Sequence, residues 1–216
     1  MTLTNIEMAV IAAAVIAALM AGSLHIRVNL WLYGIETFLI AVATGLTASA
    51  HAEVGLLCIA FLIAGLKSAG IPLYLASTME KLHISRDMGA VVTPPLAMHA
   101  CILLLAISFL LTKELPAAEG GAACWCGAAA GISLVFTGLI LMLTRRLAIS
   151  QILGFLVIEN GIYVFALTQT QGMPLFVEMG VMLDVLVGVM IAGLLTFKIQ
   201  KSFEHIDVAQ LTDLKD

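Results

Sequence analysis

The stretch LGFLVIENGIYVF, residues 153–165, is a run of apolar residues interrupted at its centre by Glu159 and Asn160. It belongs to a longer apolar segment at about 147–169, and a helix needs ~20 such residues to cross a bilayer. A charged side chain in the middle of a spanning helix costs roughly 2.5–3.5 kcal/mol unless it faces the interior of a bundle. The stretch therefore predicts one helix of a multi-helix membrane bundle, with Glu159 turned away from lipid.

The composition of the whole chain agrees with this prediction. Hydrophobic residues make up 62% of the 216 positions and charged residues 11%, and the mean hydropathy is +1.10. A soluble domain carries roughly 25% charged residues. So few charges cannot cover a water-facing surface, and we predict an all-α integral membrane protein. Seven segments are long and apolar enough to span: 3–22, 28–48, 54–77, 95–112, 122–144, 147–169 and 175–197.

The basic residues predict the orientation of these seven transmembrane helices. Lys113 falls in a loop on one side and Lys67 lies inside a span, whereas the other cations fall on the opposite side. Because basic residues gather in cytoplasmic loops, we predict that the N-terminus is outside and the C-terminus is cytoplasmic. The cytoplasmic set is Arg27, Lys81, Arg86, Arg145, Arg146, Lys198, Lys201 and Lys215.

The second and third predicted helices resemble the sixth and seventh. A central glutamate occurs in YGIETFLIAVATG at 33–45 and in LGFLVIENGIYVF at 153–165, and the steps Glu53-Val-Gly55 and Glu178-Met-Gly180 follow. The two blocks are four helices apart, so both copies run in the same direction and form a parallel internal repeat. The predicted division is 1–94 for the first three-helix repeat and a cytoplasmic loop, 95–121 for a linking helix and outer loop, 122–201 for the second three-helix repeat, and 202–216 for a cytoplasmic tail.

Four ionisable side chains fall close to the middle of a span: Glu36, Lys67, Glu159 and Asp184. Such groups must face the bundle interior and there pair, bind water or become neutral. Carboxylates and an amine at one depth on adjacent helices are what a proton relay requires. Two structural alternatives remain open. Glu159 and Asn160 could form a hydrogen-bonding pair that holds helices together, and Lys67 could be a static partner of Glu36.

Other residues are candidates for proton entry or for support of the relay. His99 lies in the first turns of the fourth predicted helix, Glu53 and Glu178 lie near the outer boundary, and Asn160 adjoins the central glutamate. The alternative for His99 is a satisfied helix-end histidine, and for the two glutamates it is a solvated loop edge. The four cysteines are scattered, and Cys-Trp-Cys at 124–126 is not a metal-binding spacing. We expect no metal site, cofactor or catalytic centre in this chain.

The segments SQILGFLVIENGIYVFAL at 150–167 and VEMGVMLDVLVGVMIAGLLTFKI at 177–199 resemble hydrogenase-4 component E. This is a membrane subunit of formate-hydrogenlyase-type and related group 4 nickel-iron hydrogenases. The tail DVAQLTDLKD at 207–216, the total length, and Lys67 followed by Pro72 are also similar to the family. The resemblance covers essentially the whole chain and is strongest over 145–216.

The two predicted repeats are in turn similar to the small K-type subunit of respiratory complex I, and the C-terminal half also to the C subunit of Mrp antiporters. K-type subunits carry membrane-embedded glutamates on a lateral proton pathway, and their Gly-x-Glu step is reproduced at 34–36. In the second repeat that site is Leu156, and the acid appears three residues later as Glu159, on nearly the same helix face. The second family glutamate matches Asp184, whereas the first repeat has Ile59 there. The resemblance thus implies Lys67 as a titratable group in place of that acid.

The resemblance implies a non-catalytic membrane-arm subunit of a hydrogenase complex coupled to proton or sodium translocation, in the plasma (inner) membrane of a prokaryote. Its expected partners are large antiporter-like membrane subunits, a homologue of the quinone-type membrane subunit of complex I, and the lipid bilayer, with no nucleic acid. The nickel-iron and iron-sulfur centres would belong to partner chains. Two alternatives are an Mrp-like cation/proton antiporter small subunit and a structural membrane spacer.

Overall fold

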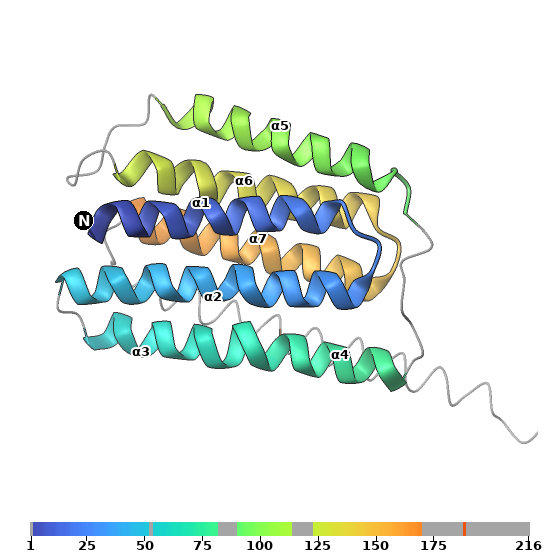
Figure 1. The fold of residues 1–216 in the computed structure, drawn as a ribbon, viewed down its shortest axis with the longest axis horizontal. Helices are drawn as coiled ribbons and strands as arrows, with labels where there is room; N and C mark the ends of the chain where they lie inside the picture. The colour runs from blue at the N-terminus through green and yellow to red at the C-terminus, as the bar shows by residue number, and fades with distance from the viewer. Residues whose placement is uncertain (1, 52–53, 82–89, 114–122, 170–187, 189–216) are drawn as a thin grey trace, which may run out of the picture. The chain divides into compact units, whose positions relative to one another are not determined.

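The computed structural model describes residues 2–51, 54–81, 90–113, 123–169 and 188, and every named element that they form is a helix (Figure 1). Contacts divide the chain into Met1–Gly180 and Val181–Asp216, and the named helices all belong to the first unit. The helices are α1 (Thr2–Ala21), α2 (Ile26–His51), α3 (Val54–Leu62), η1 (Ile63–Gly70), α4 (Ile71–Lys81), α5 (Pro94–Thr112), α6 (Ala123–Thr144) and α7 (Ala148–Gln169).

Five helical stretches within the described residues are long and apolar enough to cross a membrane. They are Ile26–Ser49, Val54–Ser77, Pro94–Thr112, Trp125–Thr144 and Ala148–Gln169, and Asn5–Ala21 is a shorter apolar helix. The prediction of an all-α membrane protein is confirmed, and the first six predicted segments coincide with helices. The seventh, 175–197, lies outside the described residues.

Packing within the first unit is built from two antiparallel hairpins, α1 with α2 and α6 with α7 (Figure 1). The hairpins contact each other through α1 with α6 and through α2 with α7. The helix α5 packs on α1 and α6, whereas α3, η1 and α4 follow one another as a rod along α2. As a result α2 lies between that rod and α7, which positions the site described below.

Arg145 directly follows α6, in the loop where the sequence predicted a cation, and its side chain is buried. Its Nη2 donates hydrogen bonds to the carbonyl oxygens of Ala21 at 2.8 Å and Ser23 at 2.9 Å. The last carbonyls of a helix lack partners within the helix and carry a partial negative charge, so a guanidinium is well suited to them. Arg145 therefore ties the C-terminal end of α1 to the end of α6.

Glycines bring α6 and α7 into backbone contact. A Cβ added at Gly131 would lie 2.8 Å from the carbonyl oxygen of Gly161, and one at Gly138 would lie 2.5 Å from that of Gly154. The reverse additions, at Gly161 and Gly154, meet the carbonyls of Gly131 and Gly138 at 2.7 and 2.9 Å. Small residues at a helix interface allow this approach, which raises packing contact where lipid provides no hydrophobic drive.

Replacing Gly138 with alanine is expected to destabilise the folded chain by about 1–3 kcal/mol, the usual cost of overpacking a tight contact. The new methyl group would meet backbone atoms of α7, which cannot move aside as a flexible side chain can. We expect the melting temperature of the purified chain in mild detergent to fall by on the order of 5 °C. Gly55→Ala is the matched control, because nothing lies within 4 Å of a Cβ there. Equal melting temperatures for the two variants would contradict this account of the interface.

Candidate functional site

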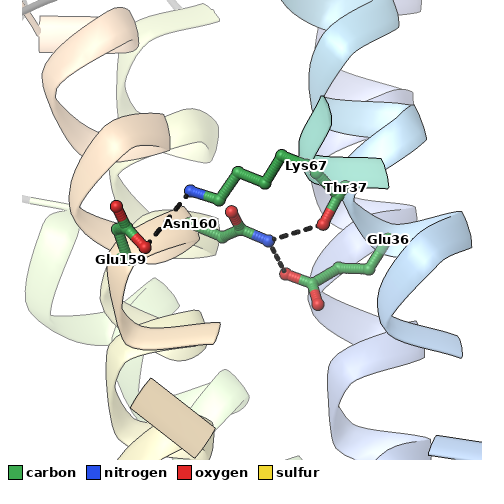
Figure 2. A network of polar contacts seen from close by, with 5 residues as sticks. All are labelled: Glu36, Thr37, Lys67, Glu159 and Asn160. Atoms are coloured by element: carbon green, nitrogen blue, oxygen red, sulfur yellow. Dashed lines mark hydrogen bonds and ion pairs between the residues drawn. The ribbon is translucent and has the colours of Figure 1, made fainter. Parts of the chain in front are cut away.

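Five polar side chains from three helices meet between α2, η1 and α7 (Figure 2). All five are buried, with exposed fractions between 0% and 5%. Uncompensated polar and charged groups are expensive in such surroundings, so the contacts among them decide what the cluster can do. The members of this polar cluster are Glu36 and Thr37 of α2, Lys67 of η1, and Glu159 and Asn160 of α7.

Asn160 joins α7 to α2. Its Nδ2 donates hydrogen bonds to Glu36 Oε1 at 3.0 Å and to Thr37 Oγ1 at 2.9 Å. The two bonds use both amide hydrogens and fix the side chain between two acceptors. The second oxygen of Glu36, Oε2, is buried and accepts no hydrogen bond from the described residues. Glu36 is therefore held at one oxygen and has acceptor capacity left at the other.

Lys67 reaches across to α7 and forms an ion pair with Glu159, with Nζ 3.5 Å from Oε2. Both side chains are at most 6% exposed. The distance is longer than the 2.7–2.9 Å of a tight charge-assisted hydrogen bond, so the pair is held by charge more than by a short directed bond. Glu36 belongs to the same buried cluster, on the other side of Asn160 (Figure 2). Lys67 is thus paired with one of the two carboxylates, and Asn160 holds the other.

A π-helix carries Lys67. In η1 the backbone amides donate hydrogen bonds to carbonyls five residues earlier, as the Ile71 amide does to the Leu66 carbonyl. Pro72 is the second residue of α4, and a proline ring in a regular α-helix clashes with the carbonyl four residues earlier, here that of Ser68. We attribute the wider turn to this proline. Short π segments are rare and frequently occur at functional sites, because they change the direction in which a side chain leaves the helix.

Gly34 sets the close approach of α2 to η1. Ser68 Oγ donates a 2.8 Å hydrogen bond to the Gly34 carbonyl, and a Cβ at Gly34 would lie 3.0 Å from the Ser68 carbonyl oxygen. Any side chain at this position would press on the backbone of η1. The glycine of the Gly-Ile-Glu step therefore has a packing reason of its own, and it keeps Lys67 near enough to α2 for its side chain to reach α7.

A second polar contact joins the same two helices eight residues further along α2. The hydroxyls of Thr44 and Tyr163 lie 3.1 Å apart, and Thr44 also donates to the Ile40 carbonyl at 2.8 Å. Eight residues correspond to ~12 Å of helix. Sequence reasoning did not single out Thr37, Thr44 or Tyr163. The signal was present, since 37 and 44 are polar positions seven residues apart and hence on one helix face.

Two other residues that were considered from the sequence, His99 and Ile59, do not belong to the polar cluster in the structure. His99 is exposed on α5, and its Nδ1 lies 2.6 Å from the Pro95 carbonyl of the same helix. This is the geometry of a histidine satisfied at a helix end, and α5 packs on α1 and α6. Ile59 packs against an apolar group of Ala48, Leu56 and Leu167. Glu53, Glu178 and Asp184 lie outside the described residues.

Comparison with known proteins adds one partial match. No family model matches the chain, and no solved structure matches it. A protein of Mycobacterium tuberculosis named "Uncharacterized protein Rv0085" is 41% identical over 87 residues. The match covers 40% of this chain and 40% of that protein, so the chain spans less than half the length of this relative. That name states no activity, and the polar cluster remains the feature from which a function is inferred.

Proposed function

We propose that this chain is a membrane-arm subunit of a membrane-bound nickel-iron hydrogenase complex of the formate-hydrogenlyase type. Its buried charges would pass protons, or exchange them for sodium, as hydrogen is made or consumed. The observation that carries the proposal is the buried ion pair of Lys67 with Glu159, next to a second buried carboxylate, Glu36, that Asn160 holds on α2. The resemblance of the sequence to hydrogenase-4 component E supplies the kind of complex.

The chemistry of the cluster suits proton movement within the membrane. A carboxylate and an ammonium in contact can exchange a proton within the site. The proton moves from nitrogen to oxygen, and the ion pair becomes two neutral groups. Lys67 can shift its balance between Glu159 and Glu36 by turning flexible side-chain bonds. Asn160 does not titrate at any ordinary pH, so its role would be to hold Glu36 in place. Asp184, outside the described residues, would continue the path into the next helix of the second repeat.

The proposal includes the membrane topology of the chain. The chain would have seven spans, an outer N-terminus, a cytoplasmic C-terminus and a parallel repeat in which helices two and three correspond to helices six and seven. The subunit would lie in the inner membrane of a prokaryote, between large antiporter-like subunits and the homologue of the quinone-type subunit. Nickel-iron and iron-sulfur centres would remain in its partners. Arg27 at the start of α2, Glu80 at the end of α4 and Arg145 after α6 would then lie at the cytoplasmic face. The end of α1, to which Arg145 is bonded, would lie there too.

Glu159→Gln tests the relay in the assembled complex. The substitution keeps the size of the side chain and an amide oxygen that can accept a hydrogen bond from Lys67, but it removes the titratable group. We therefore expect assembly and hydrogen production to persist while ion pumping into inverted membrane vesicles falls several-fold. Asp184→Asn is expected to give the same separation. Glu7→Gln, in a partly exposed position on α1, is the matched control. Normal pumping in both relay variants would refute the proposal.

A structural spacer is the second candidate, and the hydrogen bonds of Asn160 favour it because they tie α2 to α7 without any titration. The same variants separate the two functions. If Glu159→Gln and Asp184→Asn abolish assembly and never give an assembled complex that fails to pump, the spacer function is the better one. A third candidate is an Mrp-like antiporter complex, and the chains that co-purify in mild detergent test it. A nickel-iron large subunit among them supports the hydrogenase, and antiporter subunits alone support the Mrp-like complex.

A further inference from the structure

An apolar groove runs along the outer side of the first unit, between α2 and the rod of η1 and α4. Its volume is about 510 Å³, within the roughly 300–1,000 Å³ of small-molecule sites. Trp31, Phe38 and Leu73 line it and are exposed by 66%, 51% and 62%. Its floor includes Gly34 and Ser68, where the two helices touch. Neither Lys67 nor Glu159 is among the residues that line the groove.

One end of the groove carries an ion pair. Arg27 Nη2 lies 2.9 Å from Glu80 Oε1, and the two side chains are 66% and 65% exposed. Exposed ion pairs of this kind add little stability, so another molecule can join them at small cost. The contact between them uses one nitrogen of a guanidinium with five donors and one oxygen of a carboxylate, which leaves both groups able to bind further.

The helix ends reinforce these two charges. Arg27 lies in the first turn of α2, where free amides carry a partial positive charge, and Glu80 lies in the last turn of α4, where free carbonyls carry a partial negative one. A positive and a negative charge therefore lie side by side at one end of the apolar groove. Such a pattern complements a zwitterion whose phosphate faces Arg27 and whose ammonium faces Glu80.

The length of the groove indicates what kind of molecule fills it. From Arg27 to Phe38 there are eleven residue steps along α2, or ~16 Å of helix. The hydrocarbon core of a bilayer is ~30 Å thick, so the groove covers about one leaflet. A spanning helix of a partner subunit would need an apolar contact along the whole thickness. An acyl chain hanging from a headgroup needs one leaflet and one polar end.

We propose that this groove is a binding site for a phospholipid with a primary amine, such as phosphatidylethanolamine. Its phosphate binds Arg27, its ammonium donates hydrogen bonds to Glu80, and one acyl chain lies against Trp31 and Phe38. Phosphatidylcholine fits less well because its quaternary ammonium has no hydrogen to donate. Phosphatidylglycerol fits less well because it brings a negative charge to Glu80 with no ammonium to offset it. The site is independent of the proposed proton relay.

The test measures lipid binding to the full chain. Delipidated protein in detergent is mixed with each of the three lipids, bound lipid is counted by native mass spectrometry, and the melting temperature is recorded. We expect phosphatidylethanolamine to bind several-fold more than the other two and to raise the melting temperature most. Glu80→Gln should abolish the preference over phosphatidylcholine, and Arg27→Gln should weaken binding of both. Glu7→Gln, on α1 away from the groove, should leave binding unchanged.

A substitution at the apolar end makes the test independent of charge. Ala69 lines the groove and is exposed, so Ala69→Phe would fill it without disturbing buried packing. We expect this variant to fold and to bind several-fold less phosphatidylethanolamine. Equal binding of the three lipids, or an unchanged preference in Glu80→Gln, would overturn the proposal. So would crosslinking of Ala69→Cys to a partner subunit in native membranes, because a helix of another protein would then occupy the groove.

Discussion

Lys67→Met is expected to destabilise the folded protein by about 3–5 kcal/mol, the cost of removing one partner of a buried ion pair. The substitution keeps an unbranched chain of similar length but leaves Glu159, which is 3% exposed, without the ammonium 3.5 Å away. For a chain of this size the melting temperature in mild detergent should fall by on the order of 10 °C. Lys113→Met, at an exposed position after α5, is the control and should change it little.

The double variant Lys67→Met/Glu159→Leu distinguishes the cost of leaving one buried charge unpaired from the cost of losing the ion pair as a whole. Apolar residues of similar volume can replace a buried ion pair at little cost or even with a gain. We therefore expect the double variant to recover most of the stability that Lys67→Met loses. A double variant less stable than either single one would show that the charges act through other partners. Recovered stability without recovered ion pumping would assign the pair to function and not to folding.

The fold was predictable in outline because a bilayer leaves few choices. Apolar length fixes where spans begin and end, and the absence of water requires each backbone group to bond within its helix. The predicted segments therefore coincide with helices as far as the described residues reach. The close contact of α6 with α7 was not predicted, although its glycines, at 131 and 138 and at 154 and 161, are spaced seven residues apart on each helix. Nothing in the sequence told which pair of helices would meet there.

The membership of the polar cluster was easier to predict than its connections. Charges near the centre of a span identified Glu36, Lys67 and Glu159, because depth in a membrane can be counted from the ends of a segment. Partner choice depends on how each helix is turned about its axis, and the π segment before Pro72 changes that turn for Lys67. The ion pair consequently forms with Glu159, whereas the sequence suggested Glu36 as the static partner.

Arg145 shows the limit of counting along the chain, which places a residue but does not give its partner. It was predicted as a loop cation, and it does lie in the short connection between α6 and α7. In the structure it is 3% exposed and bonded to the end of α1. A basic residue at a span boundary can thus contribute to packing, because the C-terminal ends of helices carry carbonyls that need donors.

Asn160→Leu is the second variant expected to have a large effect. Leucine has a similar volume but donates no hydrogen bond, so Glu36 Oε1 and Thr37 Oγ1 lose the donor they share. A buried acceptor left without its partner costs about 1–3 kcal/mol, and two acceptors are affected here. The melting temperature in mild detergent should fall clearly below that of Asn5→Leu, a matched change at an exposed position on α1.

A double-mutant cycle with Glu36→Leu identifies the bond itself. If Asn160 stabilises the chain through Glu36, the two substitutions together cost less than their sum, with a coupling of about 0.5–3 kcal/mol. Additive effects would show that Asn160 and Glu36 do not act on each other. The cycle also bears on the proposed relay, in which a proton that arrives at Glu36 would continue to Glu159 only if α2 and α7 hold the two carboxylates in fixed positions about Lys67. We therefore expect Asn160→Leu, where it assembles, to pump less than its stability alone would account for.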